Sequence, residues 1–246
     1  MNWKYLLLGL AAIVAGSILF EHYAELLYPM VDLGLIDIRG VALGEPQSFH
    51  FFKDGTQVGN YTYSVVDPDP QTGTYRAMHR TKVSYEGTSI LLEGLFRFDA
   101  SYRPLEYALN ATTGTATESI LCSFSPGLAT ITLTGGGETN VLTQEIPEDA
   151  LLVENSMPGY WEMLFQSAAF ERGKRYSASV FVPQAGGVKS LSLVVEKDLR
   201  QLRIGDQLLD CTIIKESNLG LTFYIHGGEL VQYQDEAQEV LLRKTT

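Results

Sequence analysis

A single helical stripe interrupts a chain whose hydrophobic residues otherwise follow the two-residue period of β-strands. Within 158–170, Trp161, Leu164, Phe165 and two later alanines recur at intervals of three and four residues, which is typical of one face of an amphipathic helix. A lone helix with large aromatic residues must bury that face, and the rest of the sequence offers only a sheet as its partner. We therefore expect a strongly curved antiparallel sheet that wraps over this helix.

The strand-like runs are short and are separated by turn residues. From Ala129 to Thr134, apolar residues alternate with threonines, which is typical of a strand with one buried face. Asp54 and Gly55 form a dipeptide that is favoured in two-residue hairpins. About a dozen such runs, joined by short turns, predict antiparallel neighbours in meander order. The predicted fold class is therefore mainly β, a curved antiparallel half-barrel packed over one helix.

The N-terminal segment has the composition of a membrane-spanning helix. Tyr5 to Phe20 contains no charge and no proline, while Lys4 precedes it and Glu21 follows it. A positive residue before an apolar run holds that end in the cytoplasm, so the chain after it is expected to be exported. A helix of this length rises about 24 Å, slightly less than the hydrocarbon core of a bilayer. The sequence predicts a single-pass membrane protein with a cytoplasmic N-terminus and a periplasmic or extracellular C-terminal domain.

A cleaved signal peptide is the alternative to a retained signal anchor. Cleavage requires small residues after the apolar core, and Ala15, Gly16 and Ser17 are the nearest match. The apolar run continues beyond them to Phe20, so we favour the retained anchor. The expected organisation is an anchor over 1–30, a juxtamembrane linker over 31–45 and an extracytoplasmic β domain over 46–246.

Charge and motifs exclude several classes of function. The formal net charge of −11 argues against nucleic acid as a partner, because phosphates require a basic face. The sequence has no nucleophile elbow, no phosphate-binding loop and no histidine pair at metal-ligand spacing. We therefore expect no enzymatic activity, no catalytic residue, no metal and no cofactor. An enzyme would require His50, His79 or His226 to meet a carboxylate in one cleft.

The two cysteines lie in separate strand-like runs, each on the apolar face of its run. Cys122 is flanked by Ile120 and Phe124, and Cys211 by Leu209 and Ile213. A disulfide between them is permitted outside the cytoplasm. Two buried free thiols, packed as small hydrophobic residues, are the equal alternative.

Large apolar residues are the remaining candidates for a binding site. We expect several of them to meet where the sheet covers the helix. They either fill the core completely or leave an apolar cavity for a lipid tail. The cavity candidates are Phe96, Phe98, Trp161, Leu164, Phe165, Phe181 and Phe223.

Three short motifs and the mid-chain helix carry a resemblance to a known family. They are Gly55–Tyr63 (GTQVGNYTY), Tyr102–Tyr107 (YRPLEY) and Tyr224–Val231 (YIHGGELV). With these features the chain resembles the LolA/LolB-like superfamily and, more loosely, DUF3108-type exported domains, over residues 46–246. The resemblance implies a curved sheet with an inserted helical lid that binds acyl chains or acts in envelope-lipid handling. No lipobox cysteine follows the N-terminal segment, which departs from the pattern of a soluble shuttle.

Two functions follow from these features. The first is a membrane-anchored domain that binds a lipid or another hydrophobic ligand in a pocket beneath the 158–170 helix. Such a domain would act in the handling of envelope lipids or lipoproteins. The second is a structural or interaction module of the cell envelope with a filled core, which pairs with a protein partner through a long unprotected strand edge.

Overall fold

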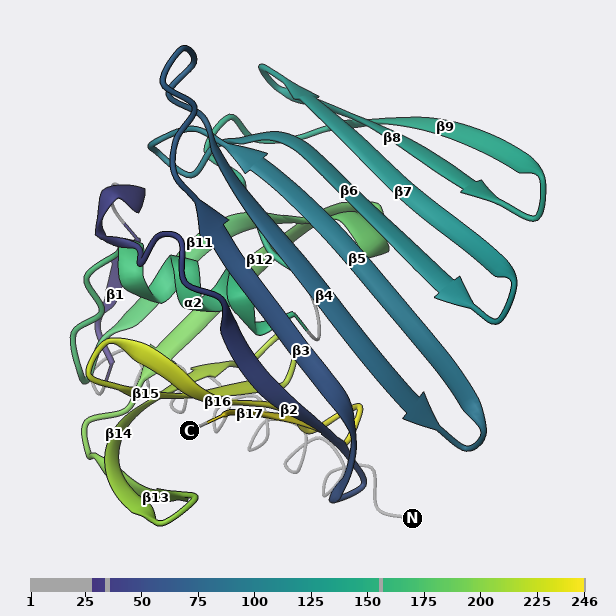
Figure 1. Cartoon of the computed structure of the whole chain (residues 1–246). Helices are drawn as coiled ribbons and strands as arrows, with labels where there is room; N and C mark the ends of the chain where they lie inside the picture. The colour runs from purple at the N-terminus through teal and green to yellow at the C-terminus, as the bar shows by residue number, and fades with distance from the viewer. Residues whose placement is uncertain (1–27, 34–35, 155–156, 246) are drawn as a thin grey trace, which may run out of the picture.

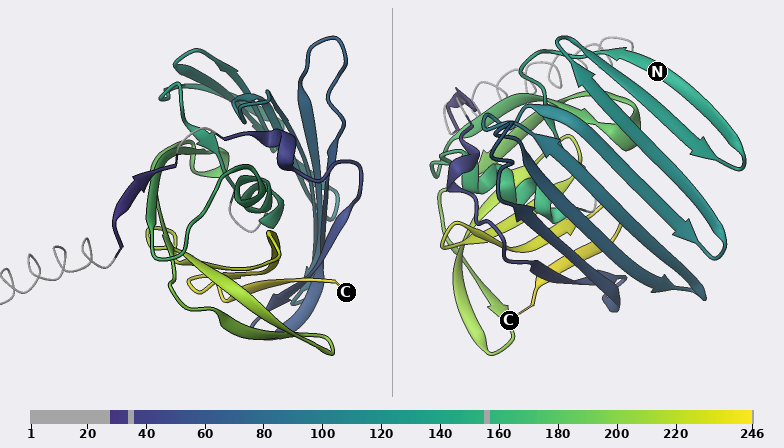
Figure 2. Two further views of the ribbon diagram at one scale, coloured as in Figure 1. Left: turned by 90° about the vertical axis from the view of Figure 1, so that its left-hand side faces the viewer. Right: turned by 45° about the horizontal axis from the view of Figure 1, so that its top comes forward.

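The computed structural model describes residues 28–33, 36–154 and 157–245. Its strands form one continuous sheet of 17 strands, and the sheet curls around helix α2 (Pro158–Ser167) without closing into a barrel (Figures 1 and 2). The left view of Figure 2 shows α2 inside the hollow of the curled sheet. The prediction of a mainly β half-barrel over one helix is confirmed, although the sheet has more strands than the dozen expected.

The first half of the sheet is an antiparallel meander of long strands. Hairpins join consecutive strands, and at the first of them both Asp54 and Gly55 have positive φ angles, 50° and 74°. Positive φ at both central residues is the geometry of a type I′ turn, so that prediction is confirmed. The strands are β2 (Gln47–Lys53), β3 (Thr56–Val66), β4 (Tyr75–Tyr85), β5 (Thr88–Phe98), β6 (Pro104–Thr113), β7 (Ala116–Ser125), β8 (Leu128–Gly135) and β9 (Glu138–Glu145).

The second half continues the same sheet in antiparallel order after α2. Its last strand pairs with β2, with Leu242 opposite Phe51, so the C-terminal strand joins the two halves. The strands are β11 (Arg175–Val182), β12 (Gly187–Val195), β13 (Arg200–Ile204), β14 (Gln207–Glu216), β15 (Leu221–His226), β16 (Glu229–Asp235) and β17 (Val240–Lys244). A short 3-10 helix, η2 (Pro183–Ala185), connects β11 to β12.

Two short strands depart from the expected antiparallel order. Strands β1 (Met30–Asp32) and β10 (Leu151–Leu152) both pair in parallel with β11. The 3-10 helix η1 (Ile38–Gly40) and all of β1 except Met30 lie within the stretch that we expected to be a linker. Ile38 is fully buried there, and the amide of Asp37 donates to the carbonyl of Ser167 at the end of α2, 3.0 Å away. This stretch is therefore part of the folded domain, because its apolar residues cover the end of the helix.

Helix α2 is buried on every side. Trp161 is fully buried and Phe165 is 7% exposed, so the expected shelter of the aromatic stripe is confirmed. The opposite face is buried as well, including the charged side chain of Glu162, so the helix has no solvent-exposed polar face. Pro158 occupies the first turn, where its fixed φ suits a helix start. The expected capping residues Asn155 and Ser156 lie outside the described residues.

The predicted anchor over residues 1–30 lies almost entirely outside the described residues, which begin at Tyr28. Within the described part of the chain, no helix is both long enough and apolar enough to span a bilayer. The anchor therefore stays a prediction from the sequence.

Candidate functional site

The seven predicted cavity residues are all buried, and their rings form separate contact groups. Trp161 and Phe165 both pack on Phe223 of β15, with ring centroids 4.7 and 5.0 Å apart. Leu164 is buried on the same helix. Phe96 and Phe98 stack on each other at 4.7 Å on the wall formed by β5. These aromatic contacts occupy the space beneath the helix, which counts against a lipid-sized cavity there.

Phe181 lies apart from the other predicted residues. Its ring meets Phe124 of β7 edge-on, with centroids 5.5 Å apart. This contact joins β11 to the first half of the sheet, on the side of the hollow where the sheet does not close. The sequence therefore predicted the burial of all seven side chains, and the structure brings only some of them together.

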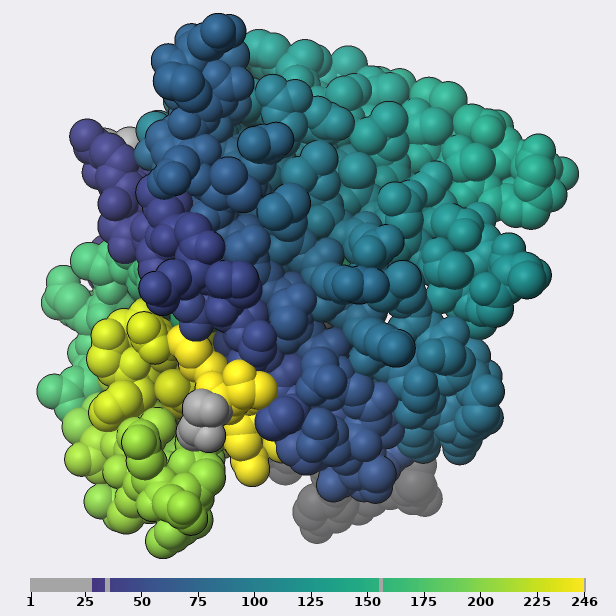
Figure 3. All heavy atoms as spheres, in the orientation of Figure 1, coloured from purple at the N-terminus to yellow at the C-terminus, as the bar shows by residue number. Residues whose placement is uncertain are grey.

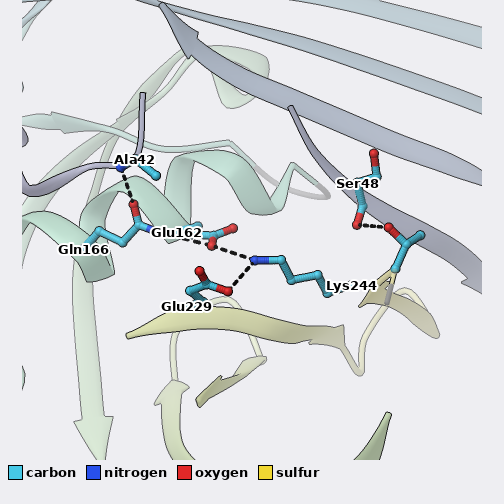
Figure 4. Close-up of polar contacts among 7 residues, drawn as sticks. Ala42, Ser48, Glu162, Gln166, Glu229 and Lys244 are labelled. Carbon is cyan, nitrogen blue, oxygen red and sulfur yellow. Dashed lines mark hydrogen bonds and ion pairs between the residues drawn. The ribbon is translucent and has the colours of Figure 1, made fainter. Parts of the chain in front are cut away.

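An ion pair between the half-buried Lys244 and the buried Glu162 connects α2 to the C-terminal strands (Figure 4). The ammonium of Lys244 lies 3.6 Å from a carboxylate oxygen of Glu162 and 2.8 Å from one of Glu229. The amide of Gln166 donates to the same oxygen of Glu162, at 3.2 Å, and its carbonyl accepts from the backbone amide of Ala42, at 3.3 Å. Burial raises the pKa of Glu162, and the positive charge of Lys244 opposes that rise. This network positions the helix in the hollow.

A second buried carboxyl lies at the start of α2. Glu154 accepts hydrogen bonds from the hydroxyl of Tyr107 and the side-chain amide of Gln184, and its backbone carbonyl accepts from the indole of Trp161 at 3.1 Å. Its second carboxyl oxygen is buried and has no hydrogen-bond partner among the described residues. Burial raises the pKa of Glu154 to about 8, and the hydrogen bond from Tyr107 opposes that rise. Sequence reasoning missed this site, although a lone charge after the apolar run 150–153 was a usable signal.

The three histidines in the described part of the chain do not converge on a carboxylate. His79 is buried, and its Nδ1 lies 2.6 Å from the hydroxyl of Tyr61, while burial lowers its pKa to about 3. His50 contacts the side chains of Asn60 and Gln57, and His226 contacts the backbone carbonyl of residue 210. The arrangement that an enzyme would need is therefore not formed by these residues. Within the described ranges no group of three metal-ligating side chains occurs.

The cysteines are two buried free thiols. Cys122 lies in the main core, where burial and the nearby Glu154 carboxyl raise its pKa to about 12. Cys211 lies in a small second cluster with Ile213 and Tyr224 on the face of β14. The structure has no disulfide between them, because the two strands direct their thiols into different clusters.

Strand β9 is a long and unprotected edge of the sheet (Figure 1). Among the described residues it pairs only with β8, in an unbroken register of eight residue pairs. Val141 is 61% exposed and Leu142 is 51% exposed. Natural sheets protect their edges with lysine, proline, bulges or very short strands, and β9 has none of these. By contrast, the edge strand β13 is shorter and carries Arg200 and Arg203.

The backbone groups of β9 alternate between the neighbouring strand and solvent. The amide of Ile146, just after β9, donates to the carbonyl of Gly127 at 3.0 Å, so Ile146 faces β8. In an antiparallel ladder every second residue faces the same way. Thr139, Val141 and Thr143 therefore direct their amides and carbonyls away from β8. These groups are free to pair with an added strand.

An apolar row on the outer face of the sheet ends at the exposed edge. It crosses six strands, β4 to β9, by direct cross-strand pairing and borders an open groove with a volume of about 600 Å³. In Figure 3 the outer face of β3 to β7 is an open surface that no other described element covers. The row consists of Met78, Leu95, Ala108, Leu121, Thr132 and Val141, of which only Thr132 is polar.

Comparison with solved structures finds partial similarity to two β proteins. A β-barrel-like protein of the domain of unknown function DUF1849 from Brucella abortus aligns with 81% of this chain and 94% of its own, at 11% identity and a TM-score of 0.48. A DUF1089 family protein from Pseudomonas aeruginosa aligns with 71% of this chain and 89% of its own, at 13% identity and a TM-score of 0.43. No family model and no curated protein matches the sequence. None of these comparisons connects the chain to the LolA/LolB-like superfamily, so that resemblance stays a prediction.

Proposed function

We propose that the chain is a non-catalytic interaction module of the cell envelope that binds an extended segment of a partner protein at strand β9. The observation that carries this proposal is the regular edge of β9, with unpaired backbone groups and an exposed apolar residue on each face. Addition of a strand to such an edge is a common mode of peptide recognition, because main-chain hydrogen bonds supply affinity and alternate side chains supply specificity.

The filled core favours this function over that of a lipid carrier. A carrier needs an apolar cavity of roughly 300 Å³ or more for its ligand. Beneath α2, the rings of Trp161, Phe165 and Phe223 are in mutual contact, and the helix is buried on every side. An interaction module needs no internal cavity, and its binding surface lies on the outside.

The membrane location of the module rests on the sequence of residues 1–30. The uncharged run from Tyr5 to Phe20, with Lys4 before it, supports a single-pass anchor and an exported domain. The first described strand, β1, begins at Met30, the last residue of the predicted anchor, and pairs with β11. The folded domain would then lie next to the membrane, where partners of the envelope are available.

The test uses the full-length protein in detergent and capped eight-residue strand-forming peptides with basic, neutral and acidic ends. We expect at least one peptide to slow hydrogen exchange at the amides of Thr139, Val141 and Thr143. The Val141→Pro variant removes one outward amide without removing a bond to β8, so it should abolish this protection. Val141→Thr retains the amide and should preserve protection.

Two outcomes would overturn the proposal. The first is that none of the three peptide classes slows hydrogen exchange at the β9 amides. The second is unchanged peptide binding by the Val141→Pro variant, which would place the binding elsewhere. Recovery of a stoichiometric lipid in native mass spectrometry of the purified protein would instead support the carrier function.

A further inference from the structure

We infer that the segment bound at β9 carries lysine or arginine at both ends and apolar residues at its centre. This inference rests on the proposed function of the β9 edge and adds the chemistry of the partner. It follows from the distribution of charge around β9, from the pairing of its two ends and from the side chains at its middle.

The part of the sheet around β9 has carboxylates and no basic side chains. Between Arg103 and Arg172 the sequence contains no lysine, arginine or histidine. The exposed carboxylates near β9 form no ion pair within the described part of the chain. These carboxylates belong to Glu118, Glu138, Glu145, Glu148 and Asp149, and the last two share a groove with Arg103. Glu118, Glu138 and Glu145 have no basic side chain within ion-pair distance among the described residues, and their negative charge favours a cationic partner.

At the start of β9, two carboxylates flank a glycine. Gly135 of β8 pairs with Glu138 of β9, and Glu118 of β7 lies beside Gly135, next to the last β7–β8 pair of Ser119 and Thr134. The side chain of Glu118 folds over Gly135, because a Cβ atom at Gly135 would lie only 3.1 Å from Cγ of Glu118. A cationic residue opposite Glu138 on an added strand would therefore be close to two carboxylates.

The end of β9 is also acidic, and its centre is apolar. Glu145 is the last residue of the strand and is exposed, whereas Glu148 and Asp149 in the next turn share a groove with Arg103. At the centre, Val141 extends the apolar outer row, while Leu142 pairs with buried Ile131 on the inner face. An added strand with apolar central residues would continue both rows by cross-strand contact.

A second copy of the chain fits this edge less well. Pairing of β9 with β9 of another copy would bring together two margins that both lack basic residues. Like charges on adjacent strands are destabilising, so self-association is disfavoured. We therefore commit to a partner segment with basic ends, and we treat dimer formation as an outcome of the test.

The experiment compares two capped eight-residue peptides that differ only at their ends. Both contain two central valines between threonines, and the ends are lysine in one peptide and glutamate in the other. We expect the full-length protein in detergent to bind the lysine peptide at least about 10-fold more tightly in fluorescence anisotropy, with a difference that shrinks as salt increases. The double variant Glu138→Gln/Glu145→Gln should reduce this preference several-fold.

A matched control removes two exposed carboxylates far from β9 in the sheet order. Asp198→Asn/Asp206→Asn changes the net charge by the same amount, on the connections that flank β13. This variant should retain the full preference for the lysine peptide. Equal loss of preference in both double variants would overturn the inference, since it would assign the effect to net charge alone.

The remaining outcomes separate this inference from the proposed function. Equal binding of both peptides, with loss of binding in Val141→Pro, overturns the charge preference and leaves the edge function standing. Binding of the lysine peptide that survives Val141→Pro overturns both. A concentration-dependent dimer in sedimentation velocity that Val141→Pro disrupts would show that a second copy occupies the edge, which also overturns the inference.

Discussion

The imidazole of His79 lies flat against the phenol ring of Tyr160, with ring centroids 4.4 Å apart and an interplanar angle of 7°. One ring belongs to β4 and the other to α2, so this stack fixes the helix on the sheet. Tyr61 completes the arrangement: its hydroxyl accepts from the amide of Gly159 at 3.0 Å and lies 2.6 Å from Nδ1 of His79. Burial keeps His79 uncharged, because it lowers the pKa of the imidazole.

The neutral state of His79 predicts a loss of stability in acid. Burial lowers its pKa from the ordinary 6.5 to about 3, so the unfolded chain binds a proton that the folded protein excludes. The contribution of His79 to stability is complete above pH 6.5 and is lost as pH falls from 6.5 towards 3. In urea unfolding at pH 7, 6, 5 and 4, His79→Phe should reduce the pH slope by up to about 1.4 kcal/mol per pH unit. An identical slope in both proteins would contradict this.

Glu154 predicts the opposite dependence at higher pH. Its pKa rises from the ordinary 4.5 to about 8, so the folded protein holds a proton that the unfolded chain releases. The protein should therefore lose stability as pH rises from about 4.5 to about 8. Glu154→Gln mimics the protonated carboxyl and should be about 2 to 5 kcal/mol more stable than the wild type at pH 8.5, with little difference at pH 4. Glu148→Gln, at an exposed position, should change neither value.

Gly159 predicts a steric limit inside the helix. Alanine normally stabilises a helix relative to glycine by about 1 kcal/mol. Here a Cβ atom would lie 2.5 Å from the hydroxyl of Tyr61 and 2.6 Å from the ring of Tyr63. Overpacking should prevail, and Gly159→Ala should lower the free energy of unfolding by about 1 to 3 kcal/mol. Gly94→Ala is the control, because its Cβ would meet no atom closer than 3.6 Å, and thermal unfolding should show little change.

The ion pair of Lys244 and Glu162 predicts a non-additive response. Lys244→Met would leave the buried carboxylate of Glu162 without its nearest positive charge, at a cost of about 3 to 5 kcal/mol. Adding Glu162→Gln removes the uncompensated charge and should recover most of that loss. Denaturant unfolding of the two single variants and the double variant gives the coupling energy, and simple additivity would show that the pair is not coupled.

The periodicity of the sequence predicted the central relationship of the fold. The apolar stripe of Trp161, Leu164 and Phe165 had to be buried. Because short turns join the strands around it, one curved sheet was the expected partner. The sequence did not predict β1 and β10, because strands of three and two residues are too short to show an alternating pattern. The linker prediction over 31–45 failed because glycines obscured the apolar residues that cover the end of α2, such as Ile38.

The polar sites could not be predicted in the same way. Glu154 meets Tyr107 across a separation of 47 residues, and Lys244 meets Glu162 across a separation of 82 residues. Such pairs depend on the curvature of the sheet, and the hydrophobic periodicity of a segment does not determine that curvature. The edge position of β9 also depends on its having no second neighbouring strand among the described residues. Only the complete strand order reveals this.

The pairing of β17 with β2 sets the order in which this domain can assemble. The two strands stand nearly 200 positions apart, as the bond from Thr245 to Ser48, with its separation of 197, illustrates. Synthesis proceeds from the N-terminus, so β2 to β9 are complete long before β17 is made. The aromatic side chains of these early strands therefore remain exposed to solvent until synthesis ends. Contacts of such high sequence separation make folding slow and expose intermediates to aggregation. The domain is thus expected to depend on chaperones during its biogenesis.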